Sequence, residues 1–168
     1  TNNKRHHVHV AGGLEKTGRA KERMELFMGK MAVVYWSGTG NTEAMAVAVA
    51  EGAREKGAEV FLMQCSEFDV ARMDEFNAVA FGCPSMGSEQ LEEGEFEPMF
   101  SSCEAKLGGK KIGLFGSYGW GDGEWMRTWQ ETCEADGAVL VQNPVICNEA
   151  PDDGAVAECR ALGSALAD

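Results

Sequence analysis

From Met31 onward, short apolar runs alternate with segments of helical periodicity. The predicted strands are Met31–Tyr35, Glu59–Gln64, Ala78–Phe81, Lys111–Phe115 and Ala138–Val141, the last with a continuation at Val145 and Ile146 left open. The predicted helices are 42–56, 70–76, 124–134 and a final helix that Asp152 caps. Unbroken apolar strands joined by helices are typical of parallel sheets covered on both faces. The sequence therefore predicts an α/β fold with a five-stranded parallel sheet.

The acidic stretch 83–100 is predicted to be a long connection, and 116–123 a glycine-rich loop.

The whole chain of 168 residues has a formal net charge of -12. This charge argues against nucleic acid or an anionic membrane as a partner and favours basic macromolecules. Since no apolar run approaches the roughly 20 residues that cross a bilayer, we expect no membrane span and a soluble monomer.

The first thirty residues differ in charge from the rest of the chain. They carry seven Lys or Arg against three Asp or Glu, which leaves -16 for residues 31–168. Residues 1–18 have no hydrophobic periodicity, so we interpret 1–30 as an amino-terminal extension, either disordered or a tag or leader remnant. Residues 31–168 are then a single domain.

The sequence contains six cysteines but no CxxC pair. Their spacing fits neither a zinc site nor a dithiol redox motif, and we predict no metal site. Because they lie mostly inside apolar segments, we interpret them as buried reduced thiols, which indicates the cytoplasm. Disulfide bridges brought together by the fold are the alternative.

The loop after the first predicted strand reads Ser37-Gly38-Thr39-Gly40-Asn41-Thr42 and leads into a helix. Backbone N–H groups and the helix dipole at such a junction favour a phosphate, and the loop adds hydroxyl and amide donors without any Lys or Arg. The spacing lacks the lysine of a nucleoside triphosphatase loop and fails the dinucleotide pattern. A terminal monophosphate fits, and a polar turn that only caps the helix is the alternative.

The loops after the third and fourth predicted strands should meet the first loop, because ligands of open α/β sheets bind at the carboxyl ends of the strands. Trp120 lies between two glycines of the fourth-strand loop, where a flat ligand is a more plausible stacking partner than the core. Met86 in the third-strand loop could cover the other face of such a ligand. A monophosphate site with an aromatic wall suggests flavin mononucleotide (FMN).

The chain from Met31 to its end resembles the flavodoxins, particularly the short-chain type of anaerobic bacteria. The resemblance is carried by four motifs: Tyr35-Trp36-Ser37-Gly38-Thr39-Gly40-Asn41-Thr42-Glu43, Met86-Gly87-Ser88-Glu89, Glu95-Phe96-Glu97-Pro98 and Gly116-Ser117-Tyr118-Gly119-Trp120-Gly121-Asp122-Gly123. It implies a flavodoxin-like three-layer sandwich with strand order 2-1-3-4-5. Residues 31–168 would be the FMN-binding domain.

The resemblance also assigns roles to individual residues. Ser37, Thr39, Asn41 and Thr42 would bind the FMN phosphate, and Met86 and Trp120 would enclose the isoalloxazine ring. Glu89 would accept a hydrogen bond from the flavin N3–H, and the carbonyl of Gly87 would turn toward N5 on one-electron reduction. Ser88 stands where some relatives have an aspartate. The full set of expected cofactor contacts is Ser37, Gly38, Thr39, Gly40, Asn41, Thr42, Ser85, Met86, Gly87, Ser88, Glu89, Ser117, Tyr118, Gly119, Trp120, Gly121 and Asp122.

The function implied is that of a low-potential one-electron carrier rather than an enzyme, which shuttles bound FMN between semiquinone and hydroquinone. Acidic residues near the site would oppose the hydroquinone charge and attract redox partners with basic docking faces. Family partners include pyruvate:ferredoxin oxidoreductase and hydrogenase. An NAD(P)H-dependent FMN-containing quinone or acceptor reductase is one alternative, and a non-catalytic module that binds another phosphate compound is a second.

Overall fold

Six parallel strands form the central sheet. The computed structural model describes residues 29–168, so most of the predicted extension, residues 1–28, lies outside the described part. The strands are β1 (Lys30–Tyr35), β2 (Glu59–Gln64), β3 (Ala78–Gly82), β4 (Lys111–Tyr118), β5 (Val139–Leu140) and β6 (Val145–Asn148). Their order is β2-β1-β3-β4-β5, and β6 also pairs with β4. The predicted parallel sheet and its order are confirmed.

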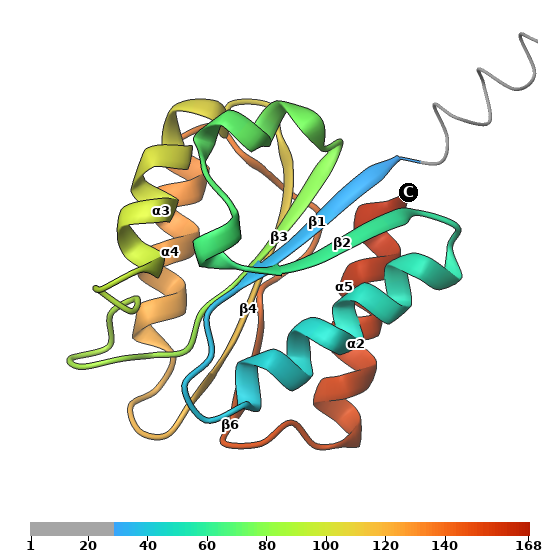
Figure 1. Cartoon of the computed structure of the whole chain (residues 1–168). Helices are drawn as coiled ribbons and strands as arrows, with labels where there is room; N and C mark the ends of the chain where they lie inside the picture. The colour runs from blue at the N-terminus through green and yellow to red at the C-terminus, as the bar shows by residue number, and fades with distance from the viewer. Residues whose placement is uncertain (1–28) are drawn as a thin grey trace, which may run out of the picture.

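Helices cover both faces of the sheet and make the three layers visible in Figure 1. One face carries α2 (Asn41–Glu55) and α5 (Asp153–Ala167), and the other carries α3 (Phe96–Cys103) and α4 (Glu124–Ala135). Short 3-10 turns occur at Cys65–Glu67, Val70–Glu75 and Glu104–Lys106. Within residues 29–168, no helix combines the length and the apolar character that crossing a membrane requires.

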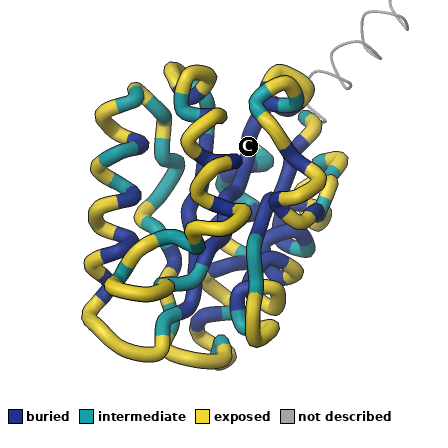
Figure 2. The backbone as a smooth tube through the Cα atoms, turned by 60° about the vertical axis from the view of Figure 1, so that its left-hand side comes forward, coloured by how far each residue is buried: buried dark blue, intermediate teal, exposed yellow. Residues whose placement is uncertain are grey.

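The central strands β1, β3 and β4 are buried on both faces because their side chains alternate between two apolar clusters. In β1, Ala32 and Val34 pack in the cluster beneath α3 and α4, whereas Val33 and Tyr35 pack in the cluster beneath α2 and α5. Figure 2 shows the buried strands between largely exposed helix surfaces. The cysteines are free thiols, as predicted, and all are buried except the half-buried Cys147.

The carboxyl-terminal half of the sheet differs from the prediction. β4 continues through Tyr118, although 116–118 were assigned to the glycine-rich loop. The predicted fifth strand is divided into β5 and β6, and β6 pairs with β4 from Phe115–Val145 to Tyr118–Asn148. The extension of β4 depends on this pairing, because the partner strand supplies the hydrogen bonds that a loop would lack.

The acidic connection contains a helix that the sequence analysis missed. α3 has Phe96, Met99, Phe100 and Cys103 buried on one face. Their spacing of three and four residues was a usable signal, but the charges around it suggested a loop. Glu92 starts the helix, since its carboxylate accepts hydrogen bonds from the N–H groups of Gly94, Glu95 and Phe96 at 2.6, 2.9 and 2.8 Å. A side chain four residues ahead thus satisfies N–H donors that the helix itself leaves free.

The predicted helix at 70–76 is a 3-10 helix.

The Glu92 carboxylate should make stability depend on pH. Partial burial opposes its ionisation, but the three N–H donors outweigh this and hold its pKa below the usual value of 4.5. A depressed pKa in the folded state stabilises the fold above the unfolded pKa, and this contribution disappears as pH falls through the folded pKa. We expect Glu92→Gln to lower the free energy of unfolding by about 1 kcal/mol at pH 7 and by progressively less below pH ~4. Urea unfolding across pH measures this, with the exposed Glu93→Gln as control; a gap that stays constant down to pH 2 would contradict it.

Helices α2 and α5 pack closely through two glycines. A Cβ on Gly52 would overlap the carbonyl oxygen of Arg160, and a Cβ on Gly163 would overlap that of Val49. The guanidinium of Arg160 then ties the two helices together by binding Glu51 at 2.5 Å and Glu55 at 2.7 Å. This contact fixes α2, and therefore its amino terminus, against the sheet.

Gly163→Ala should destabilise the protein because the added methyl meets rigid backbone. We expect a loss of about 1 to 3 kcal/mol in the free energy of unfolding. Gly154→Ala in the same helix is the matched control, since its nearest neighbour is a side-chain oxygen of Asp152 at 3.4 Å and alanine favours helix. Denaturant unfolding measures the free energy of unfolding of both variants. Equal values would mean that α2 and α5 are not in the contact described.

Candidate functional site

Three loops meet at the carboxyl edge of the sheet. Tyr35 pairs with Gly82 and Gly82 with Phe115, so the chain leaves β1, β3 and β4 at neighbouring points. Two hydrogen bonds extend this pairing beyond the strands, from Trp36 N to Gly82 O and from Ser85 N to Ser117 O, each 3.0 Å. The structure thus brings together the loops that the sequence analysis expected to meet.

The first loop is folded around the hydroxyl of Ser37. Its Oγ accepts hydrogen bonds from Gly40 N at 3.1 Å and Glu43 N at 3.3 Å. Gly40 precedes α2 with φ of 95°, a left-handed conformation that favours glycine. Asn41 and Thr42 are the first residues of α2, so their N–H groups have no acceptor within the helix. These two donors and the positive end of the helix dipole remain available to an anion.

Thr42 links the first loop to β4. Its Oγ1 shares a hydrogen bond of 3.2 Å with Ser117 Oγ, and it also accepts a longer one of 3.5 Å from Ser117 N. Both side chains are buried, which is unusual for polar groups and means that each depends on the other. Ser117 lies in β4, which explains why the strand extension matters for the site.

A cavity of about 230 Å³ opens where the loops converge. Ten of the expected contact residues line it: Ser37, Gly38, Thr39, Asn41, Thr42, Ser85, Met86, Ser117, Tyr118 and Gly119. Trp36, Pro84 and Glu149 also line it and were missing from the predicted set. Of these, Glu149 was the hardest to foresee, because it follows β6 and reaches the site only through the pairing of β6 with β4. Its N–H donates to Tyr118 O at 2.9 Å.

The remaining expected residues lie outside this cavity and form its margin. Met86 and Gln90 form an antiparallel bridge, which makes 87–89 a tight turn. Gly87 has φ of 53°, and no atom lies within 4 Å of the position of a Cβ there. Glu89 also has a positive φ, of 52°. Its carboxylate accepts hydrogen bonds from Asp122 N and Glu124 N at 3.2 Å each, which joins the turn to the start of α4.

Two large apolar side chains of these loops are exposed. Trp120 is 64% exposed and Met86 is 39% exposed, although both are hydrophobic. Next to Trp120, Gly121 lies so close to the Glu89 carboxylate that any side chain would overlap it. Asp122 binds Arg127 at 2.8 Å, and this hydrogen bond and the guanidinium charge lower the pKa of Asp122. Ser88 is exposed in the turn, without a recorded side-chain hydrogen bond among the described residues.

The donor set fits a phosphate group beside a flat ring, as in the flavin expected from the sequence. The lining offers free N–H groups at the start of α2 and the hydroxyls of Ser37, Thr39 and Ser85, as a phosphate requires. None of the lining residues is Lys or Arg, so the phosphate would be held by neutral groups. The exposed Met86 and Trp120 supply apolar surface at the mouth for a flat ring. When bound, such a flavin supplies reversible electron transfer.

Thr42→Val should destabilise the protein even without a ligand. Valine keeps the shape of threonine but leaves the buried Ser117 hydroxyl without its partner, at a cost of about 1 to 3 kcal/mol. Denaturant unfolding measures the loss, and Thr128→Val, at an exposed position of α4, is the control. If the two variants unfold alike, the buried pair does not hold the loop to β4.

Comparisons of sequence and of structure with known proteins point to the same family. The family model described as Flavodoxin matches residues 33–163. The chain is 45% identical to the flavodoxin of Megasphaera elsdenii over 80% of this chain and 96% of that protein. The solution structure of that flavodoxin in its two-electron reduced state superposes with a TM-score of 0.76, covering 82% of this chain and 98% of the other. The flavodoxin of Clostridium beijerinckii is 44% identical to this chain, over 82% of this chain and 99% of that protein. A partial match, 31% identical over 52% of this chain and 68% of the other, is to an NAD(P)H dehydrogenase (quinone) of Archaeoglobus fulgidus.

Proposed function

The chain belongs to the flavodoxin family and is an electron-transfer protein rather than an enzyme, and on that premise we propose that residues 31–168 bind FMN at the carboxyl edge of the sheet. The observation that carries the proposal is the convergence of two free N–H groups of α2, several hydroxyls and two exposed apolar side chains on one cavity. Ser37, Thr39, Asn41 and Thr42 hold the phosphate, while Met86 and Trp120 flank the ring.

The surroundings of the cavity favour a low reduction potential. Glu149 lines it and Glu89 stands at its margin, with no Lys or Arg in the lining. A carboxylate ~10 Å from an added electron raises its energy by about 0.4 kcal/mol in a medium as polar as water. That is roughly 20 mV per charge for one electron. Several such charges, together with the total of -16 over residues 31–168, lower the potential of the fully reduced state by tens of millivolts.

The proposed partners are redox proteins with basic docking faces, as for the family, for example pyruvate:ferredoxin oxidoreductase and hydrogenase. The net charge of -12 supports this, since complementary charge speeds the encounter of two proteins. We propose a cytoplasmic monomer, in keeping with six free thiols. An NAD(P)H reductase would need room and cationic or backbone groups for its dinucleotide, and the guanidinium of Arg127 is engaged by Asp122.

The function is tested by reconstituting the full chain with FMN and reducing it anaerobically in steps. We expect a yellow protein that passes through a long-wavelength blue form at half reduction before it bleaches. Gly87→Ala should lower the yield of the blue form, because glycine lets the turn adopt two backbone conformations without a Cβ penalty. A hydrogen bond lost from the half-reduced state costs about 0.5 to 1.5 kcal/mol, or roughly 20 to 65 mV.

Gly57→Ala is the matched control for that variant. Gly57 also has a positive φ, of 91°, and open space around a Cβ, but it lies in the turn between α2 and β2. It should cost stability without changing the titration. Direct two-electron bleaching with steady NADPH oxidation would favour the reductase, and a chain that binds no flavin would refute both functions.

A further inference from the structure

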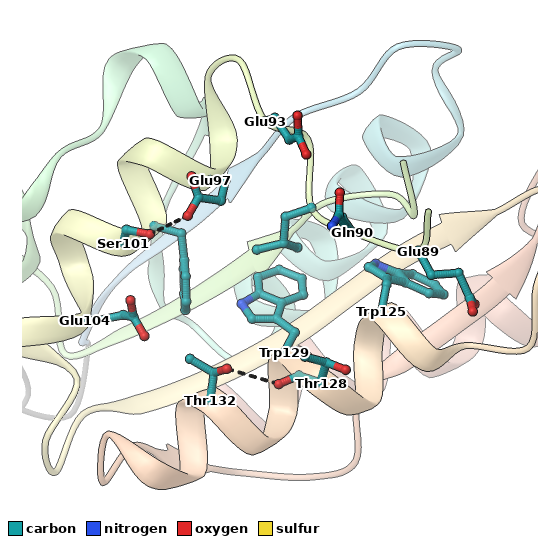
Figure 3. A pocket seen from close by; sticks show the side chains of 12 residues that line it. Glu89, Gln90, Glu93, Glu97, Ser101, Glu104, Trp125, Thr128, Trp129 and Thr132 are labelled. Atoms are coloured by element: carbon teal, nitrogen blue, oxygen red, sulfur yellow. Dashed lines mark hydrogen bonds between the residues drawn. The ribbon is translucent and has the colours of Figure 1, made fainter. Parts of the chain in front are cut away.

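A second cavity in the described part of the chain shares no lining residue with the proposed cofactor cavity. It is a groove of about 680 Å³ between α3 and α4, shown in Figure 3. Along α3 and the 3-10 turn that follows it, the groove is lined by Glu97, Phe100, Ser101 and Glu104, and along α4 by Trp125, Thr128, Trp129 and Thr132. Both sets of residues are spaced by three, one and three, so two stripes of side chains face one another across the groove. The groove is therefore a continuous channel about 10 Å long, at 1.5 Å per residue.

The groove has an apolar floor and an acidic rim. Phe100, Trp125 and Trp129 form the floor and are almost fully buried. Glu89, Glu93, Glu97 and Glu104 stand around it, and none of its lining residues is Lys or Arg. Burial, then the neighbouring carboxyl of Asp136 and the charge of Glu97, raise the pKa of Glu104 to about 7. Glu104 is therefore partly protonated near neutral pH, and a cation placed beside it would favour its charged form.

An unpaired donor lies in the floor of the same groove. The Trp129 side chain is 3% exposed, and its indole Nε1–H has no hydrogen-bond partner. Figure 3 shows this nitrogen directed across the groove toward the α3 side. A buried N–H without an acceptor destabilises the folded protein, whereas the indole N–H of Trp125 donates to Cys83 O at 3.2 Å. An occupant of the groove that offers a carbonyl oxygen would remove this cost.

We propose that this groove anchors an extended segment of a redox partner that carries arginine beside apolar residues. Guanidinium groups bind the rim carboxylates, apolar side chains contact the floor, and the peptide backbone offers carbonyl oxygens to Trp129. At about 3.3 Å per residue, the channel accommodates three to four extended residues. A protein segment matches this elongated shape and its open ends better than a compact small cation.

The groove also has the right position for an anchor. Glu89 lines one end of the groove, and the same carboxylate holds Asp122 N in the loop of Trp120. A segment seated along α3 and α4 would thus end beside the proposed cofactor site without covering it. The inference rests on the proposed function for the identity of its partner, but the groove and its chemistry stand independently of flavin binding.

The test uses the full chain labelled with ¹⁵N and the peptide N-acetyl-Leu-Arg-Val-Arg-amide as probe. The indole N–H resonance of Trp129, assigned from its loss in Trp129→Phe, should shift saturably during titration. Combined Glu97→Gln and Glu104→Gln should weaken the peptide about 10-fold, and 0.5 M NaCl should also weaken it. Glu131→Gln, an exposed carboxylate of α4 outside the groove, is the control and should leave the affinity within 2-fold. Trp129→Phe, which keeps an aromatic side chain but removes the indole N–H, should weaken the peptide about 3-fold, as followed through the indole resonance of Trp125 in the same groove.

Four outcomes would overturn the proposal. The first is a shift that does not saturate, and the second is an equal loss of affinity in the control variant. A third is that argininamide alone binds as tightly as the peptide, which would indicate a small-cation site. The last is that removing residues 1–28 by itself moves the Trp129 resonance, which would mean that the chain's own basic segment occupies the groove. Each readout is independent of the flavin titration, so failure here is distinguishable from failure of the proposed function.

Discussion

The parallel pairing of β1 with β3 and of β3 with β4 is the constraint on which the site depends. It aligns Tyr35, Gly82 and Phe115 across three neighbouring strands, so that three loops far apart in sequence begin at one edge. The sheet register alone places these three loops next to one another, so their positions do not depend on separate side-chain contacts. The same pairing buries β1 and β3 on both faces and requires helices on either side, which gives the three layers.

Two contacts convert this arrangement into a binding cavity. The glycine contacts between α2 and α5 hold α2 close to the sheet, with its free N–H groups at the edge. The buried bond between Thr42 and Ser117 then fastens the loop after β1 to the extended end of β4. A phosphate site without lysine or arginine relies on such fixed neutral donors, since their dipoles need no rearrangement when the anion arrives. In the proposed function, neutral donors also leave the negative surroundings of the cofactor uncompensated, which favours a low reduction potential.

Glu89 and Glu92 show how acidic residues serve the fold as well as the function. Glu92 caps α3, and Glu89 accepts two N–H groups at the start of α4. Both carboxylates therefore stabilise the fold. The charge count alone would have assigned them to a solvated surface. The two helices that they help to position then form the acidic groove that we propose as a docking site.

The sequence by itself determined the α/β class, the order of most elements and the loop Ser37–Thr42, because apolar runs and glycine-rich junctions are local patterns. It also carried the resemblance that gave the strand order and the cofactor. The tertiary structure decided the length of β4, the separate strand β6 and the place of Glu149, because each depends on pairing between residues that are distant in sequence. α3 lay between these cases, since its apolar spacing was present but its start depends on the Glu92 side chain. The groove between α3 and α4 could not be foreseen, because two helix stripes form a cavity only when packing brings them face to face.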